Sequence, residues 1–159
     1  MKIIVLRHGD AGRSLSDPAR DAGRGLTSEG RDAVGAVLDR FDAENLRPRR
    51  IIASPLARSA ETAELAAKKF GLMVETSEAL LPGKDLAPFV ERLRADKTMR
   101  RVMLAVHHDN IEPVLANDFG DTDKLAKGEL RVYRIKRNGT KAKRLDRIAP
   151  SDAGYEDSY

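Results

Sequence analysis

Residues 2–10 read KIIVLRHGD and residues 50–62 read RIIASPLARSAET, and these two stretches decide the fold. In each, a short run of mostly β-branched apolar residues stops abruptly at polar ones, which is typical of a buried strand that enters a loop. Residues 101–106, RVMLAV, show the same pattern and stop at His107-His108. The sequence therefore predicts three buried strands that each deliver polar side chains at their carboxyl ends.

Segments with helical spacing of apolar residues separate these strands. Thr27 and Ser54 are suited to cap the first two helices, and Pro55 is suited to the first turn of the second. Strands that alternate with helices indicate a mostly parallel sheet. The predicted helices span residues 28–44, 55–70, 85–93 and 111–119, and residues 10–26 are expected to form a loop.

The C-terminal part of the chain carries a different pattern. Residues 130–136 alternate between apolar and polar, Asn138-Gly139 is a strong hairpin turn, and residues 141–148 return. Residues 72–75 add one brief strand. The sequence thus predicts a three-layer α/β/α fold with a mostly parallel central sheet and a C-terminal antiparallel hairpin.

Composition excludes several classes of protein. The chain has 159 residues and no Cys, which excludes disulfide scaffolds, zinc ribbons and thiol nucleophiles. This length can bury a core, so we expect one domain over residues 1–150, with a disordered polar tail over residues 151–159. No apolar run approaches the roughly 18 residues that span a bilayer, so the prediction is a cytoplasmic protein without membrane contact.

The basic character of the chain is concentrated in the predicted hairpin. The formal net charge is +4, and the segment from Arg131 to Arg147 holds eight Lys and Arg residues against one acid, Asp146. On an edge ribbon such charges discourage aggregation between strands. Binding of nucleic acid or an acidic partner is the alternative, but Tyr133 is the one ring in the hairpin that could stack on a base. We therefore expect no nucleic-acid partner.

Three polar groups follow the three buried strands, and they predict an anion site. They are Arg7-His8-Gly9, Ser54 with Arg58, and His107-His108. In open α/β sheets, ligands bind at the carboxyl ends of the strands, so these groups are expected to share one crevice. Arginine forks and the N-terminus of a helix favour a dianionic phosphoryl group as the ligand.

These residues also carry a resemblance. The stretch RHGD at 7–10, the helix start Leu26-Thr27-x-x-Gly30 and SPLARSAET at 54–62 resemble the histidine phosphatase superfamily, which has the phosphoglycerate mutase-like fold. The short chain is most similar to its small SixA-like phosphohistidine phosphatase group. The resemblance implies that His8 is the nucleophile and becomes a phosphohistidine. It also implies that Arg7 and Arg58 bind the phosphoryl oxygens, and that neither a metal nor another cofactor is needed.

The physical chemistry of a nucleophilic imidazole agrees with this assignment. The ring must be neutral to attack phosphorus, and two nearby guanidinium groups disfavour the imidazolium form of His8. The family's second histidine is ambiguous here. Counting Val106 as the last strand residue puts His107 at a position where the family has a small residue, so His108 is predicted to bind phosphate and His107 to be its neighbour.

Other residues of the motifs are expected to line the pocket or to shape it. Gly9, Asp10, Ser54 and His107 are candidates for substrate binding, and Ser54 is also the expected helix cap. In mutases of this fold, a Glu after the third strand protonates the leaving group. The candidates in that region are Glu78 and Asp85, and neither receives the assignment from sequence.

The sequence predicts a metal-independent phosphatase that acts through phospho-His8, with protein phosphohistidine as substrate. The short chain leaves little for a lid and implies a shallow pocket that admits a protein surface. A phosphomonoesterase for a small molecule, such as a sugar phosphate or a nucleotide, is the alternative within the same fold. A module that binds nucleic acid or an acidic partner through the basic hairpin, residues 131–147, is the alternative of another class.

Overall fold

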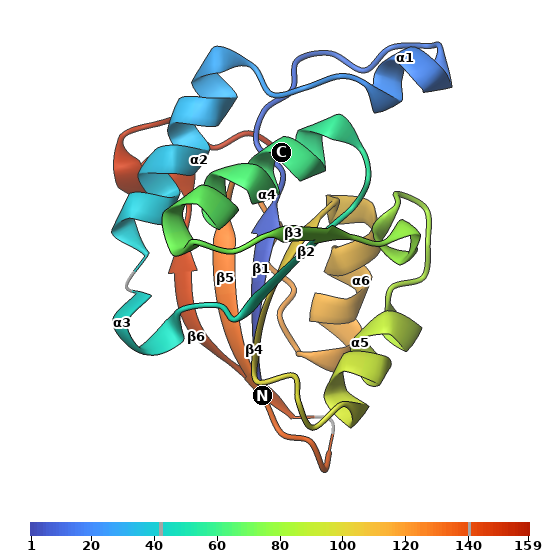
Figure 1. Ribbon diagram of the computed structural model, residues 1–159, viewed down its shortest axis with the longest axis vertical. Coiled ribbons are helices and arrows are strands. Elements are labelled where there is room, and N and C mark those ends of the chain that lie inside the picture. Colours follow the sequence, from blue (N-terminus) through green and yellow to red (C-terminus); the bar gives the residue numbers. More distant parts are fainter. Residues whose placement is uncertain (42, 140) are drawn as a thin grey trace.

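The computed structural model describes residues 1–41, 43–139 and 141–159. Within these residues one six-stranded sheet runs through the molecule in the order β3-β2-β4-β1-β5-β6 (Figure 1). The first four strands of that order are parallel, and β5 is antiparallel to both β1 and β6. The strands are β1 (Lys2–Arg7), β2 (Arg50–Ala53), β3 (Val74–Thr76), β4 (Arg101–Val106), β5 (Leu130–Ile135) and β6 (Ala142–Ile148).

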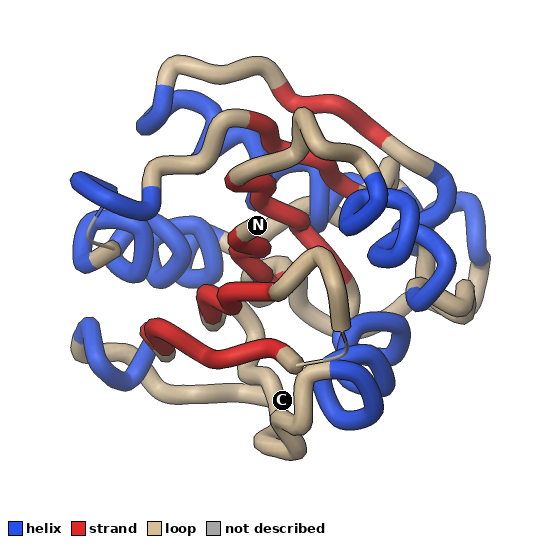
Figure 2. The backbone as a smooth tube through the Cα atoms, turned by 90° about the horizontal axis from the view of Figure 1, so that it is seen from below, coloured by secondary structure: helices blue, strands red, loops and turns tan. Residues whose placement is uncertain are grey.

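Helices cover both faces of the sheet, so the predicted three-layer architecture is confirmed (Figures 1 and 2). The helices are α1 (Pro18–Ala22), α2 (Ser28–Arg40), α3 (Ala43–Leu46), α4 (Ala57–Phe70), α5 (Ala87–Ala95) and α6 (His108–Asp118). Two short 3-10 helices, Glu78–Leu80 and Pro150–Ala153, complete the described elements.

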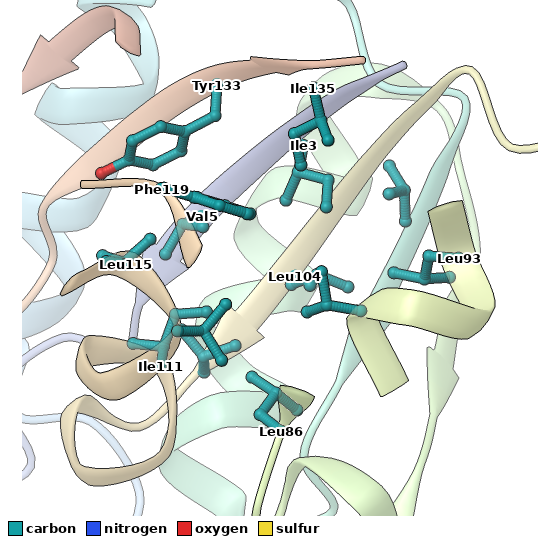
Figure 3. Packing of buried hydrophobic residues seen from close by; sticks show 14 of the residues in the cluster. Ile3, Val5, Leu86, Leu93, Leu104, Ile111, Leu115, Phe119, Tyr133 and Ile135 are labelled. Atoms are coloured by element: carbon teal, nitrogen blue, oxygen red, sulfur yellow. The ribbon is translucent and has the colours of Figure 1, made fainter. Parts of the chain in front are cut away.

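Two apolar cores lie on opposite faces of the sheet because successive residues of a strand point to opposite sides. Ile3 and Val5 of β1 face α5 and α6, where they pack with residues such as Leu93 and Ile111 (Figure 3). Ile4 faces the other way, into the core formed with α2 and α4. A strand buried on both faces has to be apolar throughout, which explains the uninterrupted run at the start of the sequence.

Several helix boundaries differ from the predicted ones. The first long helix ends at Arg40, because Phe41 adopts an extended backbone; Asp42 lies outside the described residues. The next helix begins at Ala57 with Leu56 as its N-cap, so Ser54 is not the cap. The last helix begins at His108, three residues earlier than predicted, and continues through Pro113. As a result, Ser54 does not cap α4, and His108 lies in α6 and not in the loop before it.

The segment predicted as a loop between the first strand and the first long helix contains helix α1. Its N-cap is Asp17, whose carboxylate accepts a hydrogen bond from Ala19 N, and Pro18 occupies the first turn. This is a common start for a short helix, because proline lacks the N–H that would be unsatisfied there. Helix α1 brings Asp21 toward Arg58 of α4.

The tail over residues 151–159, for which the sequence predicts disorder, makes several hydrogen bonds in this structure. Ser151 donates from both its backbone N and its Oγ to the carboxylate of Asp157, which closes the segment into a compact turn. Lys127 N donates to the carbonyl of Ser158 at 2.7 Å, and Arg7 Nη2 donates to the carbonyl of Tyr159 at 3.0 Å. Ser and Asp side chains thus satisfy backbone groups within the tail.

Part of the basic hairpin is buried in the protein. Arg131 is fully buried, and its Nε donates to Glu129 Oε1 at 2.9 Å. Tyr133 is buried as well, and its hydroxyl donates to Asp121 at 2.6 Å. The ring that could have stacked on a base is therefore part of the core. Because β6 is an edge strand, its exposed Lys143 fits the predicted role of discouraging strand pairing.

Candidate active site

The register between β1 and β4 brings two histidines together. Arg7 pairs with Val106 across the parallel strands, so the residues that follow them, His8 and His107, lie side by side. Their ring centroids are 5.2 Å apart, and the rings are tilted by 54°. His8 N also donates to Val106 O at 3.1 Å, which fixes the first turn of the chain beyond β1.

The structure places His107, rather than His108, next to His8. His107 is 2% exposed, whereas His108 is exposed and begins helix α6 at the rim of the pocket. The sequence favours His108 because the family has a small residue at the position of His107. The pairing of Arg7 with Val106 places His107, the next residue, beside His8. The role predicted for His108 stays a prediction, and His107 joins it as a candidate.

The environment of His8 selects the form of its imidazole that can act as a nucleophile. Nδ1 lies 2.8 Å from the carbonyl oxygen of Gly9, and a carbonyl only accepts, so Nδ1 carries the hydrogen. Nε2 is then left with its lone pair. The pKa of His8 is lowered to about 3, chiefly by burial and to a smaller extent by His107, Arg7 and Arg58, against the opposing effect of the Gly9 hydrogen bond. Desolvation, more than the guanidinium groups, thus keeps His8 neutral.

His107 is held by a serine from the neighbouring strand. Its Nε2 lies 2.9 Å from Ser54 Oγ, which also accepts a hydrogen bond from Leu56 N at 3.3 Å. The Ser54 hydroxyl can donate to Nε2 while it accepts from Leu56 N, and in that tautomer the other ring nitrogen carries the imidazole hydrogen. Burial lowers the pKa of His107 to about 4, with Arg58 as the next cause. His107 is thus neutral near pH 7.

We expect these two buried imidazoles to make the fold sensitive to acid. Each has a folded pKa below its usual value of 6.5, so the unfolded chain binds more protons between about pH 4 and pH 6.5. The stabilisation is fully present above pH 6.5 and is lost as the pH falls. At pH 4.5 the loss is roughly 3 kcal/mol for each histidine.

Urea unfolding at several pH values between 4.5 and 7.5 measures this slope, and His8→Asn should make it shallower. A slope identical in the wild type and in His8→Asn would contradict the assignment of a depressed pKa to His8.

Two arginines bring positive charge to the same place. Arg7 is nearly buried, and its Nη1 donates to the carbonyl of Leu125 at 2.6 Å, which fixes the guanidinium. Arg58 lies in the first turn of α4, and its Nη1 is 3.5 Å from a carboxylate oxygen of Asp21. Burial lowers the pKa of both arginines, but from a value so high that both stay cationic.

Helix α2 packs so closely on the loop after β1 that it fixes the loop's path. Thr27 caps α2 through its contact with Gly30 N, and Thr27 N donates to the carbonyl of Asp10. A Cβ added at Gly30 would lie 2.2 Å from Asp10 O, so only glycine permits this approach. The Thr27-x-x-Gly30 pattern therefore positions the backbone that follows His8.

Gly9 and Asp10 serve this packing rather than lining the pocket that contains His8. A Cβ at Gly9 would meet Val34 at 2.7 Å, and Gly9 N donates to Thr62 Oγ1 at 3.1 Å. The Asp10 carboxylate accepts from Thr27 Oγ1 and lies 3.4 Å from Lys127 Nζ. Both residues line a neighbouring cavity instead. Their expected role in substrate binding is thus indirect in this structure.

The pocket has a volume of about 340 Å³ and contains residues that sequence reasoning missed. Arg24 comes from the loop before α2, Lys127 from the loop before β5, and Tyr159 from the tail. No local pattern marks these residues, because long connections bring them back to the end of β1. The other residues that line the pocket are Arg7, His8, Ala11, Gly12, Ser14, Arg58, Pro82, His107, His108 and Asp109.

Neither carboxylate weighed as a proton donor lines this pocket among the described residues. Glu78 lies in the 3-10 helix after β3, and Asp85 accepts a hydrogen bond from Ala87 N at the start of α5. Asp109 in the first turn of α6 is the acidic side chain that does line it, and its Oδ2 accepts from Gly83 N at 2.8 Å. In the described part of the chain, no three His, Asp or Glu side chains gather as metal ligands would.

The arrangement has the parts that phosphoryl transfer requires. A neutral imidazole with a free Nε2 lies in a pocket whose cations, Arg7, Arg58, Arg24 and Lys127, offset the charge of a phosphoryl group. Transfer through a loose transition state needs chiefly in-line positioning and stabilisation of the oxygens, and fixed guanidinium groups supply the second.

Comparison with known proteins identifies the class. Residues 3–81, which include both motifs and the strands that carry them, match the histidine phosphatase superfamily (branch 1). The chain belongs to this superfamily. No curated protein is significantly similar to it in sequence.

Solved structures of that fold superpose closely on this one. The protein histidine phosphatase SixA complexed with tungstate has a TM-score of 0.83 at 20% identity, with 96% of this chain and 99% of that chain covered. A protein assigned as phosphohistidine phosphatase SixA from Agrobacterium tumefaciens has a TM-score of 0.79 at 21% identity, with coverage of 94% and 97%.

A mycobacterial glucosyl-3-phosphoglycerate phosphatase has a TM-score of 0.69 at 16% identity, with coverage of 90% and 96%. The predicted phosphoglycerate mutase-like fold is therefore confirmed. Among the described residues, no helix is both long and apolar enough to cross a membrane.

Proposed function

We propose that this protein is a phosphohistidine phosphatase that acts through a phosphorylated His8. The observation that carries the proposal is the hydrogen bond from His8 Nδ1 to Gly9 O, which leaves Nε2 unprotonated on a side chain that lines the cationic pocket. In the first step Nε2 attacks phosphorus, the bond from phosphorus to the leaving group breaks, and a phosphoramidate forms on His8.

The remaining pocket residues then act on the phosphoryl oxygens. Arg7 and Arg58 offset their charge, and the N–H of neutral His107 donates to one of them. In the second step water attacks the phosphorus of phospho-His8, the P–N bond breaks, and inorganic phosphate leaves. The leaving group of the first step takes up a proton, for which the Asp109 carboxyl or solvent is within the pocket.

Protein phosphohistidine is the substrate that the pocket favours. The pocket is open, and its mouth is formed by the segment between β1 and α2, by the start of α6 and by the tail. A phosphoramidate is more labile than a phosphate ester, so a site without a firmly placed carboxylic acid suffices for it. Similar folds also occur in phosphatases of small molecules, such as the glucosyl-3-phosphoglycerate enzyme, which makes a phosphate ester the second candidate.

We expect a protein phosphorylated on histidine to be hydrolysed at least about a hundredfold more efficiently than sugar phosphates or nucleoside monophosphates, which corresponds to roughly 2.7 kcal/mol in the transition state. The measurement is kcat/KM for each substrate with the same enzyme preparation. Arg58→Ala serves as the control, because the same pocket should lose activity toward every substrate. Faster hydrolysis of an ester would contradict the proposal that protein phosphohistidine is the substrate, but it would not contradict the mechanism through His8.

A further inference from the structure

A row of five basic residues crosses the sheet at the end opposite to the pocket. Lys2 at the start of β1 pairs in register with Arg101 of β4 on one side and with Arg134 of β5 on the other. Arg134 pairs in turn with Lys143 of β6. Arg49, which precedes β2, continues the row because its N donates to Arg101 O at 2.9 Å. We call these five residues the basic row.

The basic row is unfavourable for the fold by itself. Residues that pair in register point to the same face, and neighbouring strands are about 4.8 Å apart. Like charges directly opposite each other destabilise a sheet. Within residues 1–41, 43–139 and 141–159 none of the five forms an ion pair, whereas the adjacent Arg50 is paired with Glu75. Two of the five have a role in the fold, because Arg101 Nη1 donates to Asn45 O at 3.2 Å and Lys143 lies on the edge strand. The repulsion along the row is left without an acidic partner among the described residues, and a bound anion would offset it.

An open cavity of about 520 Å³ lies over the basic row. Four members of the row line it, and no acidic side chain and no aromatic ring does so among the described residues. Figure 2 looks at this end of the molecule, with the N-terminus near the middle of the sheet. The lining residues are Met1, Lys2, Arg49, Lys97, Arg100, Arg101, Arg134 and Arg137.

One arginine builds the wall of the cavity. Arg137 donates through Nη1 to the carbonyls of Arg94 and Asp96, at 2.9 and 2.8 Å, and through Nη2 to the carbonyl of Met99 at 2.5 Å. These bonds hold the loop before β4, which carries Lys97 and Arg100, against the hairpin. Asp96, whose carboxylate accepts two hydrogen bonds from Thr98, is close enough for Arg137 to help lower its pKa, but its side chain does not line the cavity.

We propose that this cavity binds an oligophosphate chain, meaning three or more linked phosphates. Seven Lys and Arg side chains around so small a volume match a ligand with many charges in little space, and arginine forks fit phosphate oxygens. An acidic peptide carries fewer charges in that volume. A single-stranded nucleic acid needs rings on which its bases stack, and the described lining has none.

Such a ligand would not compete with phosphate at His8. The cavity and the pocket lie at opposite ends of β1, whose six residues span about 20 Å. An inorganic oligophosphate and the triphosphate of a nucleotide share the chemistry that the cavity recognises. These two sources differ in whether the ligand also carries a base and a sugar.

Isothermal titration calorimetry with inorganic tripolyphosphate tests the proposal on the full chain. We expect one ligand to bind in the cavity, besides any that binds in the pocket of His8, and we expect Lys2→Gln/Arg134→Gln to raise the Kd of the cavity at least about tenfold, since two charge-assisted contacts are lost. The matched control, Lys68→Gln/Lys84→Gln, removes two exposed charges elsewhere and should leave Kd unchanged. Neither double variant should alter phosphatase activity, because none of these residues lines the pocket.

The same titration identifies the source. ATP that binds as tightly as tripolyphosphate points to a nucleotide, and ATP that binds at least tenfold more weakly points to an inorganic chain. Absence of tripolyphosphate binding at low salt would overturn the proposal. So would binding that Arg58→Ala abolishes while the basic-row variant retains it, or tighter binding of a DNA oligonucleotide or a polyglutamate peptide.

Thermal unfolding gives a second readout, which separates a loss of ligand binding from a loss of stability. Without ligand, Lys2→Gln/Arg134→Gln should melt no lower than the wild type, because it relieves repulsion between neighbouring strands. Tripolyphosphate should then raise the Tm of the wild type and of the control but not that of the basic-row variant. An equal rise in all three proteins would contradict the site.

Discussion

Replacing His8 with alanine is expected to abolish formation of the phosphoenzyme and to lower kcat/KM by at least about a thousandfold. The reason is that His8 Nε2 is the one nucleophile of the proposed mechanism, and the water that remains in its place is far weaker. The measurement is incubation with a labelled phosphodonor, followed by a test for label that is labile to acid and stable to base, which distinguishes phosphohistidine from a phosphate ester.

The control for this variant is its fold. His8 is 7% exposed and neutral, so alanine leaves a cavity but no unpaired charge, and the variant should unfold cooperatively. Binding of inorganic phosphate should persist, because Arg7 and Arg58 are unchanged. A folded His8→Ala protein that still turns over its substrate at a wild-type rate, or still takes up acid-labile label, would eliminate the covalent mechanism.

Replacing His107 with alanine should lower kcat/KM by about a hundredfold, whereas His108→Ala should change it by less than about threefold. These two residues are adjacent in sequence and identical in chemistry, so each is the natural control for the other. His107 lies against His8 and offers a neutral donor to a phosphoryl oxygen, while His108 is exposed at the rim. The measurement is steady-state kinetics of both variants on one substrate.

Ser54→Ala refines this comparison. It removes the hydroxyl 2.9 Å from His107 Nε2 and leaves the ring in place, so its effect should be smaller than that of His107→Ala. If His108→Ala were the more damaging change, the site would have to be rebuilt around the start of α6, and the present geometry would not describe the enzyme at work.

The class of fold and the place of the pocket could be predicted from local sequence. Strands β1 and β2, which end at Arg7 and Ala53, are buried on both faces. Such continuous apolar runs can be recognised from sequence alone. Because parallel strands end at one edge, His8 and Arg58 could also be expected in one pocket, and the structure brings them there. The N-cap at Thr27 could also be predicted, because capping depends on residues that are close together in the sequence.

Which of His107 and His108 lies beside His8 could not be predicted from local sequence. It depends on the register between β1 and β4, which pairs Arg7 with Val106 through contacts formed by the whole sheet. The presence of Lys127 and Tyr159 in the pocket could not be predicted from local sequence either. Tertiary hydrogen bonds set the path of the segments that carry them. The carboxylate at Asp109 was hidden because the predicted helix began too late to include it.

The contact between Arg7 and the carbonyl of Tyr159 has a practical consequence. Any polypeptide joined after Tyr159 would start at the wall of the pocket, within reach of the guanidinium expected to hold phosphate. An affinity tag or a fused domain at that end would therefore become part of the surface that a phosphorylated protein has to approach. Kinetic comparisons between differently tagged preparations would then report on the tag as well as on the enzyme.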